Sequence, residues 1–245
     1  MYAIAGGKGG VGKTTTALNL AAAFEARGVD TAVVDADLGM TNLGELAGID
    51  NDVSVHDVLS GEATVESALV EGPAGADILA GEYDLDAYER ADPAQLREVS
   101  EQLREEYDVV IADTGAGLSH ASLVPFGLAD GVVVVTTDDE AAVADATKTA
   151  EMVRKVDGTV LGTVVTRTDD EDAAEAVAEE MGEPLLETVP RAPALAGEEP
   201  MVETAPDSDP AKAYHRLRDA VRAAAPHGAN VGTADADRIA SPTQD

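Results

Sequence analysis

The feature that most constrains this chain is a glycine-rich segment at residues 7–15, which reads Gly-Lys-Gly-Gly-Val-Gly-Lys-Thr-Thr. It follows a short apolar run at residues 2–5 and opens a helical pattern, with the helix expected to begin at Lys13. The spacing Gly-x-x-x-x-Gly-Lys-Thr predicts a loop whose backbone N–H groups cradle phosphates, assisted by the positive end of the helix dipole. Lys13 is expected to meet the β- and γ-phosphates, and the Thr14 hydroxyl is expected to ligate Mg²⁺. The predicted cofactor contacts in this segment are Gly7, Lys8, Gly9, Gly10, Val11, Gly12, Lys13, Thr14 and Thr15.

Composition narrows the class of protein. The chain has 245 residues and no cysteine, which excludes disulfides, thiolate metal sites and cysteine nucleophiles. No apolar run approaches the ~18 residues of a membrane helix. A strand that starts at residue 2 leaves no room for a signal peptide, so we expect a cytoplasmic protein, with a membrane or a cell pole reached only through a partner.

The charge balance is strongly acidic. Aspartate and glutamate number 48 against 16 lysines and arginines, which gives a formal net charge of -32. The acids are spread along the chain, so its surface repels itself at low salt and is screened at molar salt, where the Debye length is ~3 Å. We interpret this as adaptation to a salty cytoplasm, the alternative being a merely acidic protein. Attraction to nucleic acid or anionic lipid is disfavoured in both cases.

Strand-like runs alternate with helical patterns along most of the chain. This alternation predicts an α/β fold with a single doubly wound, mostly parallel sheet and helices on both faces. We expect one domain over residues 1–226 and a disordered acidic tail over residues 227–245. The expected strands cover residues 2–5, 31–36, 77–80, 108–112, 131–137, 159–165 and 185–189, and the last helix covers residues 208–225.

Carboxylates follow two of these strands at the edge where the phosphate loop is expected to lie. Asp35 and Asp37 are two positions apart, so they point to the same side, where one can join a metal shell and the other can orient a water molecule. Asp113 ends an apolar strand in the manner of a Walker B element and is expected to reach Mg²⁺ through water. Gly117 is expected to offer its backbone N–H to a γ-phosphate.

These elements together resemble the MinD/ParA ATPases. Lys8 precedes Lys13 by five positions, as in the deviant Walker A motif of that family. Residues 35–42, with Asp35, Asp37 and Asn42, resemble the first switch of the family, and residues 113–117 resemble the second. Residues 136–140 stand where the family has a Thr-x-Pro-Glu turn. The resemblance extends from residue 2 to about residue 225.

The resemblance implies a P-loop ATPase that binds ATP with Mg²⁺ and forms a sandwich dimer. Lys8 would reach the nucleotide of the partner subunit, Lys13 would hold phosphate, and Asp37 would position the hydrolytic water; these three are the expected catalytic residues. Thr14, Asp37 and Asp113 would form the metal site. The family also implies a protein activator or a cargo adaptor, and a role in placing a division site, a chromosome or plasmid, or polar machinery.

Two departures from the family bear on base recognition. Arg167 is preceded by Thr166 where the family often has Asn-Arg, and Pro190 begins Pro-Arg-Ala where the family often has Pro-x-Asp. Arg167 and Pro190 are the expected base contacts, and the preference for ATP over GTP rests on the resemblance.

Other interpretations remain open at this stage. The loop also contains Gly-x-Gly-x-x-Gly from Gly7 to Gly12, with Asp35 where a ribose-binding acid belongs, so a dinucleotide-binding oxidoreductase is an alternative. A nucleotide-binding adaptor with little hydrolysis would carry the same loop. Nothing after residue 226 resembles a membrane-binding amphipathic helix. The final helix carries basic residues that we expect to form a solvated face, although a DNA or partner surface is possible: Lys212, Arg216, Arg218 and Arg222.

Overall fold

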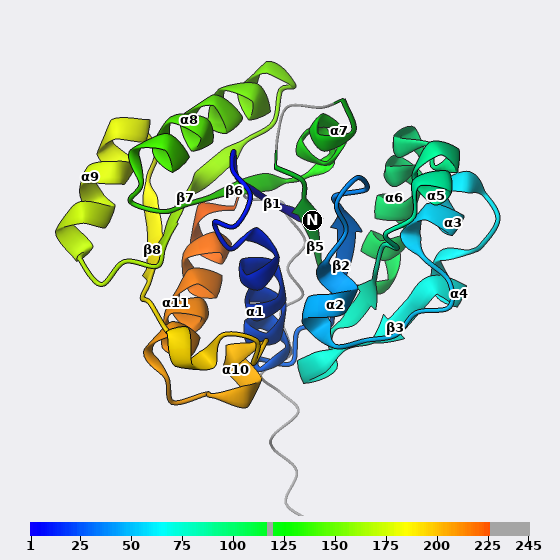
Figure 1. The fold of residues 1–245 in the computed structure, drawn as a ribbon, viewed down its shortest axis with the longest axis horizontal. Coiled ribbons are helices and arrows are strands. Elements are labelled where there is room, and N and C mark those ends of the chain that lie inside the picture. The colour runs from blue at the N-terminus through cyan, green and yellow to red at the C-terminus, as the bar shows by residue number, and fades with distance from the viewer. Residues whose placement is uncertain (117–119, 226–245) are drawn as a thin grey trace, which may run out of the picture.

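The computed structural model describes residues 1–116 and 120–225 and contains a central sheet of eight strands in the order β3-β4-β2-β5-β1-β6-β7-β8 (Figure 1). Each neighbouring pair is parallel except β3 and β4, which are antiparallel. The predicted α/β fold with a mostly parallel sheet is thereby confirmed. The strands are β1 Tyr2–Ala5, β2 Thr31–Ala36, β3 Leu69–Glu71, β4 Asp77–Leu79, β5 Val109–Thr114, β6 Gly131–Thr136, β7 Val160–Thr166 and β8 Leu185–Val189.

The prediction missed β3, which has three residues and lies at the edge of the sheet. The predicted tail at residues 227–245 lies outside the described residues. Among the residues described, no helix is both long and apolar enough to span a lipid bilayer. The helices are α1 Lys13–Glu25, α2 Leu43–Ala47, α3 Val55–Ser60, α4 Val65–Ala68, α5 Leu85–Arg90, α6 Leu96–Glu106, α7 His120–Leu128, α8 Glu140–Lys155, α9 Glu171–Met181, α10 Met201–Thr204 and α11 Asp209–Ala224.

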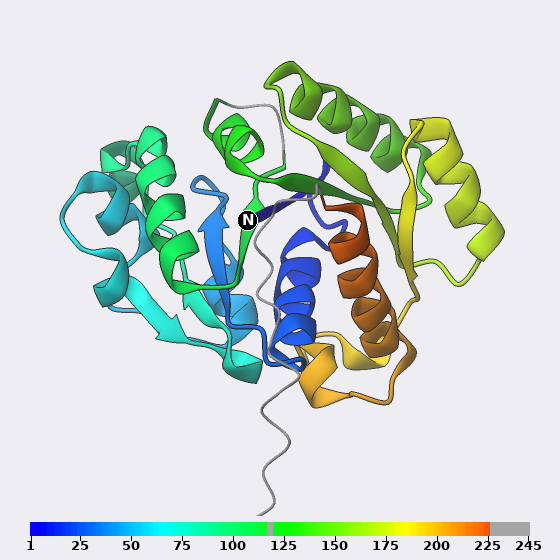
Figure 2. The ribbon, with the colours of Figure 1, turned by 180° about the vertical axis from the view of Figure 1, so that it is seen from behind.

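Helices cover both faces of the sheet because alternate strand residues point to opposite faces. On one face, Tyr2 and Ile4 of β1 join the core beneath α1 and α11, which lie side by side (Figures 1 and 2). On the other face, Ala3 and Ala5 join the core beneath α6 and α7. A third cluster packs α8 and α9 against β6 and β7. The central strands are therefore buried on both faces, which explains their continuous apolar runs.

Several of the acidic residues cap the N-termini of helices. Asp84, Asp139 and Asp170 each accept a hydrogen bond from the backbone N–H three residues later, and they thereby cap α5, α8 and α9. A carboxylate at this position satisfies a free N–H group and interacts favourably with the helix dipole. Some of the acidic residues therefore specify where helices begin, in addition to charging the surface.

We expected the basic residues of the final helix to face solvent, but one of them is buried. Arg218 is 2% exposed, and its guanidinium donates to the carbonyl oxygen of Ala23 in α1 at 3.0 Å and pairs with Asp219 at 2.8 Å. The prediction was wrong for this residue because the long side chain crosses the interface between α1 and α11. Arg216 pairs with Glu187 of β8 at 2.8 Å, so it also binds within the molecule.

Asn19 links α1 to the segment before α10. Its side-chain amide is fully buried, donates to the carbonyl oxygen of Thr15 at 2.9 Å and to the Glu199 carboxylate at 2.6 Å, and accepts from the backbone N–H of Val202 at 3.1 Å. All three partners lose a bond if this amide is removed. A buried polar group left without a partner costs about 1–3 kcal/mol.

We therefore expect Asn19→Ala to lower the free energy of unfolding by about 2–4 kcal/mol, measured by chemical denaturation at high KCl. Asn51→Ala is the control, because Asn51 donates a single hydrogen bond to the carbonyl oxygen of Val53 at 3.2 Å. That change is expected to cost about 1 kcal/mol or less. Equal losses for the two variants would contradict the role given to Asn19.

Candidate nucleotide-binding site

The glycine-rich segment forms a loop between β1 and α1 whose shape requires glycine. Gly10 and Gly12 have φ angles of 78° and 97°, in the left-handed region that favours glycine. The loop is fastened from a distance, because the Thr166 hydroxyl at the end of β7 donates to the carbonyl oxygen of Val11 at 2.7 Å. The same hydroxyl lies 3.1 Å from the carbonyl oxygen of Thr136, at the end of β6. The loop conformation is thus set by neighbouring strands as well as by its own sequence.

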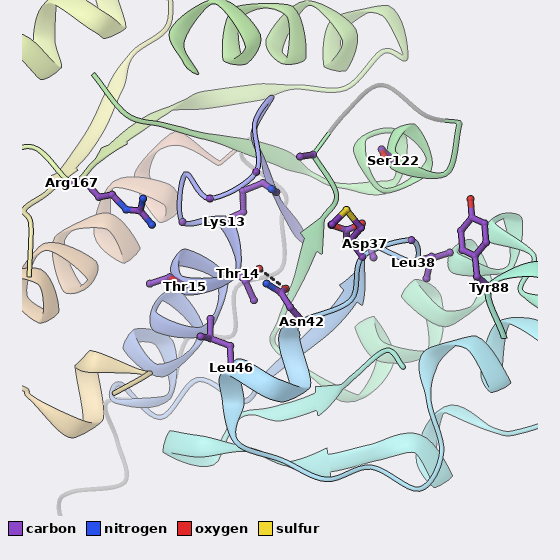
Figure 3. Close-up of a pocket in the computed structure, with 17 residues that line it drawn as sticks. Lys13, Thr14, Thr15, Asp37, Leu38, Asn42, Leu46, Tyr88, Ser122 and Arg167 are labelled. Carbon is purple, nitrogen blue, oxygen red and sulfur yellow. Dashed lines mark hydrogen bonds between the residues drawn. The ribbon is translucent and has the colours of Figure 1, made fainter. Parts of the chain in front are cut away.

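A cavity of about 490 Å³ opens beside this loop, at the carboxyl ends of the parallel strands (Figure 3). This volume is within the range of small-molecule sites in proteins. The loop after β2 contributes Asp37 and Asn42 to the opposite wall. Of the predicted loop contacts, the residues that line the cavity are Gly9, Gly10, Gly12, Lys13, Thr14 and Thr15.

Three predicted cofactor contacts of the glycine-rich segment do not line the cavity. Val11 is buried, and Gly7 packs so tightly that an added Cβ would lie 2.3 Å from the backbone of Asp145 in α8. Lys8 is turned outward, with its Nζ atom 3.2 Å from an Oδ atom of Asp139 at the start of α8. Its ammonium group is therefore available to a neighbouring molecule once this exposed ion pair opens.

A second hollow of about 410 Å³ adjoins the first and shares Gly12, Thr15 and Arg167 with it. Both predicted base contacts line it, because Arg167 follows β7 and Pro190 follows β8. Figure 3 shows Arg167 at one end of the site, on the far side of Lys13 and Thr15 from Asp37. The two hollows together extend from the metal-ligating candidates to the predicted base contacts.

Three carboxyl groups lie beneath the phosphate loop. Asp35 and Asp113 are direct neighbours on β2 and β5 and are 0% and 1% exposed. Asp37 is half-buried, and its backbone N–H donates to Asp35 at 3.1 Å. One carboxylate oxygen on each of Asp35 and Asp113 has no hydrogen-bond partner among the described residues. Asp37 lines the cavity and Asp35 does not, so of these two carboxyl groups only Asp37 is placed to contact a molecule in the cavity.

Burial dominates the electrostatics of these carboxyl groups. It raises the pKa of Asp113 to about 7, against the opposing effects of the Thr14 hydroxyl and the Lys13 ammonium group. The pKa of Asp35 is raised well above its ordinary value by burial and by the adjacent Asp113. Burial also raises the pKa of Asp37, and Lys13 again opposes the shift. Lys13 itself is only 8% exposed, so it is a nearly desolvated cation facing the cavity and this acidic group.

The donor set fits Mg²⁺. This cation prefers oxygen ligands, keeps several waters, and is usually held by one or two carboxylates together with substrate phosphates. Thr14 lines the cavity, and its hydroxyl donates to the Asn42 side chain at 3.0 Å (Figure 3). Asp113 interacts with the same hydroxyl and has one carboxylate oxygen without a partner among the described residues. Within residues 1–116 and 120–225, no group of three or more histidine, aspartate or glutamate side chains is arranged so that it could hold a metal ion by itself. The residues present therefore suit a cation that arrives with a nucleotide.

Sequence reasoning missed several residues of the cavity wall. Leu46 comes from α2, Tyr88 from α5 and Ser122 from α7, and none of these elements carries a motif. The predicted contact from Gly117 lies outside the described residues. This part of the cavity wall forms when elements distant in the sequence pack beside the loop, and a short sequence motif cannot predict such packing.

The fold and the site define a P-loop nucleotide-binding protein of the doubly wound class. Residues 2–200 match the model of the CobQ/CobB/MinD/ParA nucleotide binding domain, and the chain belongs to this family. This membership confirms the predicted resemblance.

Three similar proteins illustrate the relationship. An uncharacterised ATP-binding protein of Methanocaldococcus jannaschii is 34% identical over 223 residues, which cover 88% of this chain and 84% of the relative. The crystal structure of the cell division ATPase MinD of Pyrococcus furiosus is 34% identical, with a TM-score of 0.84, and the match covers 91% of this chain and 98% of that chain. The septum site-determining protein MinD of Pyrococcus horikoshii, solved with Mg-ADP, is 31% identical, with a TM-score of 0.83 and coverage of 90% and 94%.

The raised pKa of Asp113 predicts that the protein without Mg²⁺ or nucleotide loses stability as the pH rises. Between the unfolded pKa of 3.8 and the folded value of about 7, the unfolded state loses its proton first, so this group lowers stability as the pH rises. We expect Asp113→Asn to be more stable than the unmodified protein at pH 8, by on the order of 3 kcal/mol, with a smaller difference at pH 5. Thermal unfolding followed by circular dichroism measures this. The exposed Asp138→Asn is the control, and a difference that grows toward low pH would contradict the assignment.

Proposed function

We propose that this chain binds Mg-ATP, dimerises around it and hydrolyses it, and that this cycle positions other components in the cell. The observation that carries the proposal is the convergence of Lys13, Thr14 and Asp37 on one cavity at the carboxyl ends of β1 and β2. Family membership supports ATP binding, and the Mg-ADP bound to the Pyrococcus horikoshii relative supports the metal. We assign the ATPase domain to residues 1–226.

The residues divide the work of phosphoryl transfer to water. The backbone N–H groups of the loop and the α1 dipole bind phosphate oxygens, and the desolvated Lys13 ammonium stabilises negative charge that develops on them. Asp37 lines the cavity and accepts a hydrogen bond from a water molecule, which orients that water for attack. Thr14, Asp37 and Asp113 would hold Mg²⁺, which would supply positive charge against the phosphate oxygens. Arg167 and Pro190 contact the base in the adjoining hollow.

Lys8 is assigned to the nucleotide of the partner subunit because it does not line the cavity of its own subunit. Its exposed pair with Asp139 is worth about 1 kcal/mol or less, so dimerisation breaks it at little cost. The family match favours this ATPase over a dinucleotide-binding oxidoreductase, since that alternative gives no role to Lys8, Lys13 or Thr14. A nucleotide-binding adaptor with little hydrolysis is distinguished by turnover.

The cellular role is inferred from the relatives, which are a cell division ATPase and a septum site-determining protein. We place the protein in the cytoplasm, with a protein activator or a cargo adaptor as partner. Direct attraction to DNA or to anionic lipid is disfavoured by the net charge of -32. A fluorescent fusion imaged in living cells tests this role, because polar, oscillating, nucleoid-bound and diffuse signals correspond to different cargoes.

The hydrolysis proposal is tested by single-turnover phosphate release with Mg-ATP at high KCl. We expect Lys13→Ala and Asp37→Ala each to lower the rate by about 10²-fold or more, because one removes charge stabilisation and the other removes the orientation of water. Asp37→Ala should retain nucleotide binding. The exposed Asp138→Asn is the control and should release phosphate at the unmodified rate. Failure of the unmodified protein to release phosphate would favour the adaptor.

The dimerisation proposal is tested by light scattering of the same proteins. Asp37→Ala with Mg-ATP is expected to accumulate as a dimer, because it binds ATP without consuming it. Lys8→Ala is expected to bind nucleotide and to stay monomeric. Lys148→Ala is the matched control, since Lys148 pairs with Asp145 on the exposed surface of α8 at 2.9 Å, much as Lys8 pairs with Asp139. A monomeric Asp37→Ala, or a dimeric Lys8→Ala, would overturn the assignment.

A further inference from the structure

Asn42 stands at the start of a helix but does not cap it. The residue directly precedes α2, where an asparagine side chain usually accepts a hydrogen bond from a backbone N–H of the first helical turn. The Asn42 side chain makes no such bond. Its Oδ1 atom instead accepts from the Thr14 hydroxyl of α1 at 3.0 Å, a contact between residues 28 positions apart (Figure 3). Asn42 and Thr14 both line the nucleotide cavity, so this side chain serves the cavity and not the helix.

The start of α2 is held by other residues. The backbone N–H of Leu43, the first residue of α2, interacts with the buried carboxyl group of Asp35 in β2. The Leu43 side chain is fully buried. Gly44 packs so closely that an added Cβ would lie 3.2 Å from the Cβ atom of Ala80. Because α2 is fixed to the sheet in this way, the Asn42 side chain is presented to Thr14 from a rigid base.

The Thr14 hydroxyl has one proton and two acceptors beside it. A hydroxyl group donates one hydrogen bond and keeps two lone pairs. Besides Asn42, the hydroxyl interacts with Asp113, which has an oxygen without a partner among the described residues. Thr14 and Asp113 both belong to the proposed metal site, whereas Asn42 does not. A hydroxyl oxygen that faces a cation must direct its proton elsewhere, and Asn42 Oδ1 is the acceptor that remains for that proton.

We infer that Asn42 is a positioning residue for the metal site. Its Oδ1 atom holds the Thr14 hydroxyl proton, so that the lone pairs of the hydroxyl oxygen face the cation. Removal of a group that orients a metal ligand typically lowers metal affinity by about 10–100-fold. The inference rests on the proposed binding of Mg²⁺ with a nucleotide, and it requires no contact between Asn42 and the phosphate groups.

An amide suits this role better than a carboxylate does. The oxygen of an amide accepts a hydrogen bond without bringing a charge, and three carboxyl groups already lie beneath the phosphate loop: Asp35, Asp37 and Asp113. A further carboxylate at residue 42 would accept the same proton but would also repel the phosphates of a nucleotide. Asn42→Asp and Asn42→Ala therefore separate the acceptor from the charge.

The test measures metal binding and nucleotide binding separately. The affinity of the full-length protein for a fluorescent, nonhydrolysable ATP analogue is measured at high KCl, first in EDTA and then as free Mg²⁺ is raised. We expect Asn42→Ala to raise the Mg²⁺ concentration at half of the gain in affinity by about tenfold or more, with unchanged affinity in EDTA. Asn42→Asp should need no more Mg²⁺ than the unmodified protein, although its affinity in EDTA is expected to fall. Asn51→Ala is the matched control, because Asn51 does not line the cavity.

A double-mutant cycle tests whether Asn42 acts through Thr14. Thr14→Ala removes the hydroxyl that Asn42 orients. In that background Asn42→Ala should change the Mg²⁺ requirement by less than about twofold, because no hydroxyl is left to orient. The unfolding midpoint of Asn42→Ala, followed by circular dichroism, should equal that of the unmodified protein, since this side chain does not cap α2.

Four results would overturn this inference and leave the proposed nucleotide binding intact. The first is an unchanged Mg²⁺ requirement in Asn42→Ala. The second is weaker binding by that variant in EDTA, which would make Asn42 a direct contact of the nucleotide. The third is a failure of Asn42→Asp to retain the unmodified Mg²⁺ requirement, and the fourth is a full additional effect of Asn42→Ala in the Thr14→Ala background. Absence of nucleotide binding by the unmodified protein, with and without Mg²⁺, is the separate result that would overturn the proposed function and this inference with it.

Discussion

The structure depends on burying two carboxyl groups side by side beneath the glycine-rich loop. Asp35 and Asp113 occupy neighbouring positions on β2 and β5, and the Lys13 ammonium group partly offsets the effect of burial on Asp113. Burying carboxylates is costly unless a partner or a proton neutralises them. The sheet and both helical layers supply the hydrophobic burial that allows this arrangement. A nucleotide with its cation would bring positive charge to Asp113 and negative phosphate groups to Lys13.

The parts that could be predicted from the sequence are those encoded locally. The phosphate loop follows from the spacing of glycine, lysine and threonine, and the central strands follow from apolar runs such as residues 132–135. The edge strand β3 was missed because three residues, only partly buried, give no clear alternation. The buried Arg218 was assigned to solvent because helical periodicity places a residue on a face without revealing that a long side chain can cross to α1.

The rest of the candidate site could not be predicted because it is assembled from distant elements. Tyr88 and Ser122 join the cavity wall through the packing of α5 and α7, and hydrogen bonds between the buried His56 side chain and the backbone of Leu38 and Glu82 join three segments that share no motif. The sequence also did not indicate which apolar side chains would stay exposed. The exposure of a side chain depends on how the whole chain folds, and the acidic composition gives no sign that apolar side chains remain exposed.

One threonine connects the two ends of the nucleotide site. The Thr166 hydroxyl bonds to the phosphate loop, and the next residue is Arg167, which lies in the hollow assigned to the base. A displacement at the end of β7 would therefore reach the phosphate cradle and the base pocket through adjacent peptide units. A ligand bound at one end of the site would therefore alter the geometry of the other end through the single peptide bond that joins Thr166 to Arg167.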